Sequence, residues 1–487
     1  MSNTLKVLFV ATEVRPYSKS GGLGDVAGSL PAALKAQGVD VRVVFHKYGN
    51  IPSSHLEGAK YVGHLTTNLS WREQGASIYT IAPSSKKDVQ VYMIENDYYF
   101  GRDGYYGYGD DYERFAFFSK VSLEFLTKVD FKPDIVHFND WQTGLGCTYL
   151  RDIYKNFSFY ENMKSLFTIH NLRYQGSFGR EVLWHVGLND GYFTGGDLEF
   201  FGNVSLLKAG IIHSDAVSTV SDTYAKEIQT PAYGYGMEGL LSMRGQEDKL
   251  FGIVNGIDVN LNNPETDTRI FTNYNAENAI QNKRKNKSKL QKLLGLPVRD
   301  VPMVSCISRL DSQKGFDIIN LCIHEILSHD IQFVLLGTGE GRYEELFRNY
   351  AHQYPDKLSA QITFQDELAQ RIYAASDIFL MPSVYEPCGL GQMFAMRYGT
   401  VPIVRKTGGL ADTVKPFYPE ESACDGNGFV FEHFVASGLM WAINQALEYY
   451  NTPHWETIVK NAMLCDFSWD KSALEYVKLY KQLRDSK

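Results

Sequence analysis

The chain has 487 residues and a formal net charge of -8, with 44% hydrophobic and 21% charged residues. One hydrophobic core rarely serves so long a chain, so we expect two large folded domains. The negative charge and the lack of a long Lys or Arg run argue against nucleic acid or an anionic membrane as a partner.

The start of the chain and the cysteines indicate the compartment. The first six residues lack the charged-then-apolar order of a signal peptide, and apolar runs such as 7–11 are too short to cross a bilayer. We therefore predict a cytoplasmic protein. The six cysteines show no C-x-x-C spacing, which predicts neither a zinc site nor a disulfide framework and leaves most of them as small buried apolar groups. They are Cys147, Cys306, Cys322, Cys388, Cys424 and Cys465.

Short apolar runs rich in Val, Ile and Phe alternate with helix-compatible stretches in both halves of the chain. This alternation is typical of parallel strands joined by crossover helices. The predicted strands are 6–11, 40–45, 134–138, 165–169 and 216–220 in the first half, and 303–307, 331–336, 360–364, 378–381 and 401–404 in the second. The sequence therefore predicts an α/β fold with two doubly wound, Rossmann-like domains.

The junction between the two halves lies near an Asn-Gly turn at 255–256. We place the hinge near residue 248, which gives predicted domains 1–248 and 249–465. The polar, Asn-rich stretch 261–286 predicts an exposed connection or excursion. Apolar residues at helical spacing predict a final helix over 471–483.

A glycine-rich segment, K-S-G-G-L-G-D-V at 19–26, follows the first predicted strand and opens a helix near Asp25. Its free backbone N–H groups and the helix dipole are suited to receive a phosphate. It matches neither G-x-G-x-x-G nor a P-loop, which weakens a nicotinamide-cofactor interpretation. The segment K-T-G-G-L-A-D-T at 406–413 is similar. Either two similar half-molecules face each other, or the same turn has been used twice independently.

Further short motifs occur in order along the chain. They are HFNDWQTG at 137–144, TIHNL at 168–172, YQG at 174–176, YGMEGL at 235–240, NGID at 255–258, SRL at 308–310, QKG at 313–315 and EPCGL at 386–390. With the segment 19–26, they resemble the glycogen and starch synthases, which have the GT-B fold of two domains facing across a cleft. The resemblance implies that 1–248 is the starch synthase catalytic domain on the acceptor side. It also implies that 249–465 binds the nucleotide sugar and that 466–487 packs back on the first domain.

Arg309 and Lys314 follow the predicted strand 303–307, at the strand end where open α/β sheets bind ligands. Their fixed positive charges suit two phosphates, and the resemblance implies that they bind the diphosphate while Glu386 contacts the donor glucose. Met393 stands where many related retaining enzymes carry a second Glu. Its absence agrees with the resemblance to the glycogen synthase branch, which usually lacks this Glu. The other residues that the resemblance assigns to the donor are Lys19, Gly21, Gly22, Asn255, Cys388, Gly389 and Leu390.

His170 and Asp140 follow two neighbouring predicted strands of the first domain. The resemblance implies that the His170 backbone carbonyl lies near the anomeric carbon and that Asp140 approaches the acceptor; a buried structural histidine is the alternative. Asn139 stands where the family often has His. The aromatic loop 98–106 fits either a glucan groove or an ordinary surface loop. The remaining residues assigned to the acceptor side are Glu13, Asp25, Tyr99, Phe100 and Asn171.

The resemblance implies an enzyme that moves glucose from ADP-glucose to the non-reducing end of an α-1,4-glucan with retention of configuration. Its partners are then a nucleotide sugar and an α-glucan, without a cofactor. We assign no metal, although Asp110 and Asp111 are adjacent carboxylates. UDP-glucose is the alternative donor. A nucleotide-dependent oxidoreductase, a glycoside hydrolase and a silent glucan-binding protein are alternatives from other classes, and the oligomeric state is left open.

Overall fold

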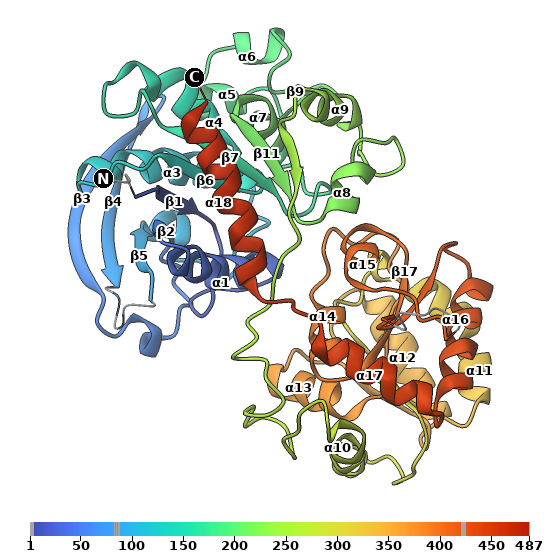
Figure 1. Cartoon of the computed structure of the whole chain (residues 1–487). Helices are drawn as coiled ribbons and strands as arrows, with labels where there is room; N and C mark the ends of the chain where they lie inside the picture. The colour runs from blue at the N-terminus through green and yellow to red at the C-terminus, as the bar shows by residue number, and fades with distance from the viewer. Residues whose placement is uncertain (1–3, 82, 84, 86–87, 420–424, 487) are drawn as a thin grey trace. The chain divides into compact units, whose positions relative to one another are not determined.

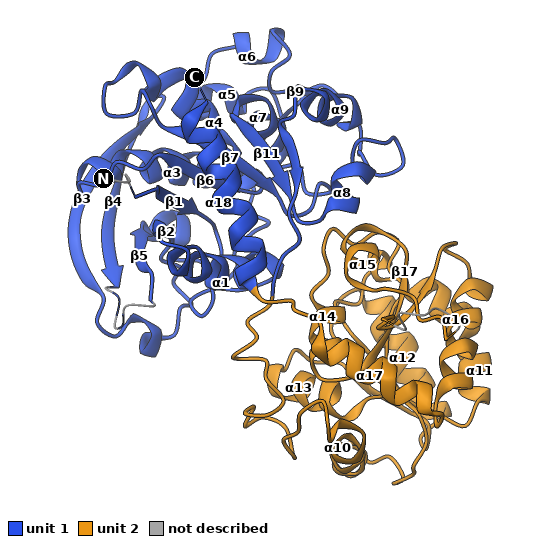
Figure 2. Ribbon diagram, viewed as in Figure 1, with its two compact units in different colours: residues 1–256, 469–487 blue, residues 257–468 orange. Residues whose placement is uncertain are grey.

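The computed structural model describes residues 4–81, 83, 85, 88–419 and 425–486. The chain forms two compact units, 1–256 with 469–487 (unit 1) and 257–468 (unit 2), coloured separately in Figure 2. Each unit is built on its own large sheet. The chain therefore crosses between the units twice, at 256–257 and at 468–469.

Unit 1 contains a nine-stranded sheet in the order β12-β11-β7-β6-β1-β2-β5-β4-β3. The strands from β12 to β5 are parallel, whereas β3, β4 and β5 pair antiparallel. In sheet order they are Leu250–Gly252, Ala216–Thr219, Lys164–Ile169, Ile135–Asn139, Lys6–Val10, Asp40–His46, Gln90–Glu95, Arg72–Ile81 and Lys60–Leu69. A small sheet adds β8 (Ser177–Phe178), β10 (Asn203–Ser205) and β9 (Glu199–Phe200).

Unit 1 contains the following helices, most of which are labelled in Figure 1. They are α1 (Gly22–Ala36), α2 (Asp97–Phe100), α3 (Asp111–Glu124), α4 (Gly144–Thr148), α5 (Val182–His185), α6 (Gly191–Thr194), α7 (Leu206–His213), α8 (Asp222–Glu227), α9 (Glu238–Gln246) and α18 (Trp469–Asp485).

The last helix, α18, packs on α1 and on the central strands of unit 1, and Figure 1 shows it in red beside the blue and green elements. It places Tyr476 and Tyr480 in the core. The Tyr480 hydroxyl lies 2.7 Å from Nδ1 of His137 in β6. An amphipathic helix at the end of the sequence thus completes the core begun by β1.

Unit 2 contains a six-stranded parallel sheet in the order β15-β14-β13-β16-β17-β18. In sheet order the strands are Leu358–Gln361, Gln332–Leu336, Met303–Ile307, Ile378–Met381, Val401–Arg405 and Phe429–Phe431. Its helices are α10 (Ala279–Leu294), α11 (Phe316–Ser328), α12 (Gly341–Gln353), α13 (Asp366–Ala375), α14 (Gly391–Arg397), α15 (Gly408–Thr413), α16 (Ala436–Tyr449) and α17 (Pro453–Leu464).

Three features differ from the sequence-based expectation. The strand predicted at 360–364 forms earlier, as β15 at Leu358–Gln361. The first unit runs to Gly256 rather than 248, because β12 pairs with β11 and so belongs to the first sheet. The stretch 261–286 is not simply an exposed connection, because Tyr274 is buried in the unit 2 core and Lys283 lies buried in α10. The Lys283 ammonium donates to backbone carbonyls of Tyr373 and Tyr398, so this polar segment fastens α10 to α13 and to the end of α14.

The cysteines follow the expected pattern where the structure describes them. Cys147, Cys306, Cys322 and Cys388 are buried, Cys465 is half-buried, and all five are free thiols. Cys424 lies outside the described residues. None of the described helices combines the length and apolar character that crossing a bilayer requires.

Candidate active site

The structure divides the predicted site residues between the two units. Unit 1 carries them after the carboxyl ends of β1, β6, β7 and β12, and unit 2 after the carboxyl ends of β13 and β16. Ligands of parallel α/β sheets bind at this edge. The unit 1 set is Glu13, Lys19, Gly21, Gly22, Asp25, Asp140, His170, Asn171 and Asn255, and the unit 2 set is Arg309, Lys314, Glu386, Cys388, Gly389 and Leu390.

In unit 1, Asp140 and His170 meet directly. The His170 backbone N–H donates to Asp140 Oδ1 at 2.7 Å. Asp140 has a positive φ of 58°, an uncommon backbone conformation for a non-glycine residue that persists only where the surroundings enforce it. Burial raises the pKa of Asp140 to about 7, against the opposing effect of the His170 and Asn171 backbone N–H groups.

The His170 ring has a defined hydrogen-bonding state. Its Nε2 lies 2.9 Å from Asn139 Oδ1, while the Asn139 amide nitrogen donates to the carbonyl of Val10 at 3.0 Å. The amide oxygen therefore faces the ring, and Nε2 must carry a hydrogen. Burial lowers the pKa of His170 to about 3. The imidazole is thus neutral at physiological pH, which is unlike a general acid.

The glycine-rich segment 19–26 is already occupied by an internal anion. Glu13 Oε2 accepts from the backbone N–H groups of Ser20 and Gly21, the latter at 3.2 Å. Its Oε1 accepts from the Ser20 and Tyr106 hydroxyls, each at 2.6 Å. The expectation that these N–H groups await a phosphate is therefore wrong for Ser20 and Gly21. Glu13 instead fixes the turn into α1, which begins at Gly22 rather than near Asp25.

Lys19 is held at the same turn by an ion pair. Its Nζ lies 2.9 Å from Asp25 Oδ2, and Arg15 Nη1 lies 3.3 Å from Asp25 Oδ1. The Lys19 side chain is 28% exposed, so it keeps partial access to solvent. The Asp25 carboxylate thus forms ion pairs with both Lys19 and Arg15 within unit 1.

Asn171 and Asn255 differ in their surroundings. Asn171 Oδ1 accepts from the Arg173 backbone N–H at 3.1 Å, which holds the side chain within its own turn. Asn255 is 6% exposed, and within the described part of the chain its Oδ1 has no hydrogen-bond partner. A buried unpaired acceptor of this kind is costly without a ligand or water.

Two predicted acceptor residues do not reach a ligand surface. Tyr99 and Phe100 are both fully buried; the Tyr99 hydroxyl donates to Glu113, and the Phe100 ring packs 4.0 Å from that of His46. We therefore correct this assignment. The short helix α2 turns these two rings inward and leaves Tyr98, 57% exposed, as the aromatic face on the surface.

In unit 2, the central feature is a buried ion pair. Lys314 Nζ lies 2.7 Å from Glu386 Oε2, and the two side chains are 13% and 8% exposed. The Ser383 hydroxyl donates to the same oxygen at 3.0 Å. Arg309 is 52% exposed, with Nη2 3.5 Å from Asp311 Oδ2. Two cations and two carboxylates are thus gathered beside the ends of β13 and β16.

Glycine residues allow this close packing. Gly315 has a φ of 78°, and a Cβ there would lie 2.0 Å from the Pro382 carbonyl oxygen. Gly408 has a φ of 44°, and a Cβ there would lie 1.9 Å from the Glu386 carbonyl oxygen. Any larger residue would push the Lys314 turn or the Glu386 loop away.

The loop after Glu386 is well ordered by internal hydrogen bonds. The Gln392 amide donates to the carbonyls of Cys388 and Gly389, at 3.2 and 3.0 Å. The Cys388 side chain is buried, and α14 begins after Leu390, its N-terminal capping residue. Polar contacts to a ligand from this loop must therefore come from its backbone.

The structure adds two residues that the sequence assignment missed. Tyr106 supports Glu13 through its hydroxyl. Phe364 follows β15 at the carboxyl edge of the unit 2 sheet and is 76% exposed. An unusually exposed ring just after a strand is a signal that only the structure provides.

Asp110 and Asp111 pair with arginines. Asp110 accepts two hydrogen bonds of 2.6 Å from Arg102, and Asp111 accepts from buried Arg114. Among the residues that the structure describes, no group of three or more His, Cys, Asp or Glu side chains is arranged to hold a metal.

Comparison with known proteins identifies the family. A model described as the starch synthase catalytic domain matches residues 6–243, and one described as glycosyl transferases group 1 matches residues 295–462. Glycogen synthase from Desulforamulus reducens is 49% identical over 483 residues, covering 98% of this chain and 99% of the relative. The chain belongs to the glycogen synthase and starch synthase family. Glycogen synthase from Clostridium novyi is 46% identical over 483 residues, with the same shares covered.

A solved structure supports both the family and the fold. The catalytic domain of starch synthase IV from Arabidopsis thaliana, bound to ADP and acarbose, is 34% identical and has a TM-score of 0.92. The match covers 99% of this chain and 100% of that one. The family resemblance and the α/β class with two Rossmann-like domains are thus confirmed. The chain is a glycosyltransferase of the glycogen synthase type.

Proposed function

We propose that this glycogen synthase family member transfers glucose from ADP-glucose to the non-reducing end of an α-1,4-glucan, retaining the α configuration. The observation that carries the proposal is the gathering of Arg309, Lys314 and Glu386 at one sheet edge of unit 2. Positive groups held in a protein site stabilise the charge that develops on a departing diphosphate. The relative solved with ADP and acarbose supports the same ligand classes.

The proposed chemistry has one bond exchange. The glucan 4-hydroxyl oxygen forms a bond to the anomeric carbon as the bond from that carbon to the β-phosphate oxygen breaks. The proton of the hydroxyl passes to the departing phosphate oxygen, and ADP leaves. Because attack and departure occur on the same face of the ring, the product keeps the α configuration.

Arg309 and Lys314 would take up the negative charge on the leaving diphosphate. Glu386 holds Lys314 at this edge of the sheet, and the arriving phosphates would compete with that carboxylate for the ammonium group. Glu386 would accept hydrogen bonds from hydroxyls of the donor glucose. The exposed ring of Phe364 at the same sheet edge offers a face on which the base can stack.

Unit 1 would supply the acceptor side. The neutral His170 ring adds no positive charge beside a sugar ring that becomes positive during transfer, and its backbone carbonyl offers a partial negative charge. Asp140 accepts the backbone N–H groups of His170 and Asn171, and the Asn171 N–H shares a peptide plane with the His170 carbonyl, so Asp140 orients that carbonyl. In this proposal Asp140 positions His170 and approaches the glucan.

The oxidoreductase alternative is disfavoured by the glycine-rich segment, whose first N–H groups are bound by Glu13 rather than free for a pyrophosphate. UDP-glucose remains the second candidate donor, because an exposed ring such as Phe364 stacks on either base.

Incubation with ADP-glucose and glycogen tests the proposal through two products, ADP and longer glucan. The proposal requires both to appear in equal amounts. Release of ADP without chain growth would indicate hydrolysis instead.

A further inference from the structure

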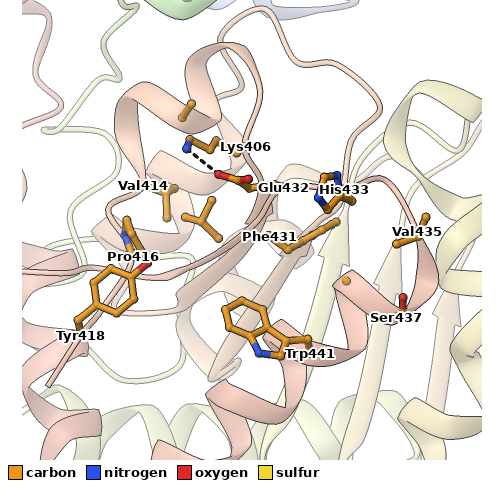
Figure 3. A pocket seen from close by; sticks show the side chains of 13 residues that line it. Lys406, Val414, Pro416, Tyr418, Phe431, Glu432, His433, Val435, Ser437 and Trp441 are labelled. Carbon is orange, nitrogen blue, oxygen red and sulfur yellow. Dashed lines mark hydrogen bonds and ion pairs between the residues drawn. The ribbon is translucent and has the colours of Figure 1, made fainter.

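A pocket lies in unit 2, and neither Lys314 nor Glu386 lines it. Its cavity of about 620 Å³ is within the range of small-molecule sites, roughly 300 to 1,000 Å³. Figure 3 shows it between the segments after β17 and β18 and the start of α16. The polar and aromatic residues of its lining include Lys406, Tyr418, Glu432, His433, Ser437 and Trp441.

Two large aromatic side chains line this pocket without being buried. Trp441 is 53% exposed and Tyr418 is 49% exposed. The floor is apolar, because Phe431 and Val414 are nearly inaccessible to solvent. Half-exposed rings around an apolar floor form the kind of surface on which a ligand with its own apolar faces can stack.

The polar groups of the pocket suit a neutral ligand. Lys406 Nζ lies 2.8 Å from Glu432 Oε1 (Figure 3), so among the described residues of the lining the one lysine is paired with the one carboxylate. The two charges of this exposed pair offset each other, so the pair adds no net charge with which to hold a phosphate. Ser437, His433, the indole N–H and the Tyr418 hydroxyl offer hydrogen bonds to uncharged hydroxyls.

The pocket is separated from the donor site by one short helix. Ala411 and Val414 of the α15 region line the pocket. At the start of that helix, the Gly409 backbone N–H donates to the Glu386 carbonyl at 3.1 Å. A ligand in the pocket would therefore not touch the Lys314 and Glu386 side chains, yet would be anchored on the same unit.

We propose that this pocket binds a segment of an α-glucan, with glucose rings stacked on Trp441 and Tyr418. A glucose ring presents C–H faces and uncharged hydroxyls, which match the two kinds of surface described above. The inference rests on the proposed function in that it takes the acceptor polysaccharide as the ligand. Anchoring one part of a long polymer raises the local concentration of its chain ends, so the site favours polymeric over short acceptors.

The test compares Trp441→Ala and Tyr418→Ala with the unchanged protein. Glycogen binding is measured by retardation in native gels without donor, and turnover is measured with glycogen and with maltotriose. We expect both the dissociation constant and the KM for glycogen to rise by about tenfold, the size typical of losing an aromatic anchor. Rates with maltotriose and the KM for ADP-glucose should change by less than about twofold.

Two further variants make the result specific. Trp441→Phe keeps a stacking face and should recover most of the affinity. Phe157→Ala removes a ring of similar exposure, 58%, in unit 1 and should bind glycogen as the unchanged protein does. Unaltered glycogen binding by both pocket variants would overturn the proposal, and so would an equal loss with maltotriose.

The gel assay also separates this inference from the proposed function. It needs no nucleotide and no turnover. Absent transfer from ADP-glucose with Trp441-dependent glycogen binding would refute the proposed function alone. Normal transfer with Trp441-independent binding would refute the pocket alone.

Discussion

The ammonium group of Lys314 lies 2.7 Å from Oε2 of Glu386, although the two residues are 72 positions apart in the sequence. Both side chains are largely buried, and Ser383 donates to the same carboxylate oxygen. A diphosphate that binds Lys314 must therefore compete with Glu386 for the ammonium group. This competition makes the response to substitution of either partner predictable.

Replacing Glu386 with Gln should tighten the binding of ADP while slowing glucose transfer. The substitution removes the negative charge that neutralises Lys314, so the diphosphate meets a more available cation. We expect the Kd for ADP to fall by about tenfold, or about 1.4 kcal/mol, in isothermal titration calorimetry. Glu367→Gln, at an exposed ion pair on α13, is the matched control. Weaker ADP binding by Glu386→Gln would contradict this account of the pair.

Removing either cation should slow turnover, with different effects on stability. Arg309→Ala and Lys314→Ala should each lower the rate by about 10² to 10³-fold, as expected for loss of an electrostatic donor. Lys314→Ala also leaves buried Glu386 without its partner and should cost about 3 kcal/mol of unfolding free energy. Half-exposed Arg309 should cost little stability.

Steady-state kinetics and thermal melting measure both effects. Arg299→Ala, which removes an exposed arginine paired with Asp330, serves as the control for charge loss. Full activity in Arg309→Ala and Lys314→Ala would refute their assignment to the diphosphate.

Glu13→Gln should destabilise the turn before α1. Glu13 accepts four hydrogen bonds through its two oxygens, and an amide nitrogen in place of one oxygen would face donors. We expect a loss of about 1 to 3 kcal/mol, as for an unsatisfied buried group. Chemical denaturation followed by circular dichroism checks the value, with exposed Glu57→Gln as the control. Equal stability of the two variants would show that Glu13 does not hold the turn.

Asp140→Asn should gain stability relative to the unchanged protein as the pH rises. The folded-state pKa of Asp140, about 7, exceeds its ordinary value near 3.9. Between these values the folded state holds the extra proton, so ionisation of Asp140 reduces stability as pH rises from about 4 to 7. The Asn side chain does not ionise, so the variant keeps its unfolding free energy over this pH range as far as position 140 is concerned.

Melting temperatures of the two proteins at pH 5 and pH 8 provide the measurement, with exposed Asp103→Asn as the control. A difference between Asp140→Asn and the unchanged protein that stays constant with pH would rule out the raised pKa.

His170 should keep its hydrogen on Nε2 and remain neutral down to about pH 4, because burial lowers its pKa to about 3 and Asn139 accepts from Nε2. Nitrogen-15 NMR of histidine-labelled protein distinguishes the two tautomers and the charged ring, and His170→Gln assigns the signal. A ring that titrates near pH 6.5 would contradict the buried geometry.

Much of the fold could be predicted because strong patterns are local. The apolar runs that became β1, β6, β7, β13, β14, β16 and β17 were found because buried parallel strands read as continuous hydrophobic segments. The hairpin of β3 and β4 was missed because its polar, alternating strands carry a weaker signal. The first unit extends to Gly256 because of β12, whose membership depends on pairing with a distant strand.

The site was harder to predict because its contacts are long-range. Motifs identified Lys314 and Glu386, but not that the two side chains form an ion pair. The sequence of the loop 98–106 did not reveal that the Tyr99 and Phe100 rings point inward, since the four-residue helix α2 determines which rings face the core. The sequence also did not reveal that the Glu13 carboxylate accepts from the N–H groups of the glycine-rich turn, because this contact depends on the path of the backbone between residues 13 and 21.

The central claim is that the chain transfers glucose from ADP-glucose to an α-1,4-glucan with retention. The most direct measurement uses ADP-glucose labelled with carbon-13 at C1 and a maltooligosaccharide acceptor, followed by NMR of the anomeric signal, with UDP-glucose in a parallel reaction. The account predicts new α-1,4-linked signals that grow in step with released ADP, and much slower growth from UDP-glucose. A β-linked product, free glucose alone, or faster transfer from UDP-glucose would contradict it.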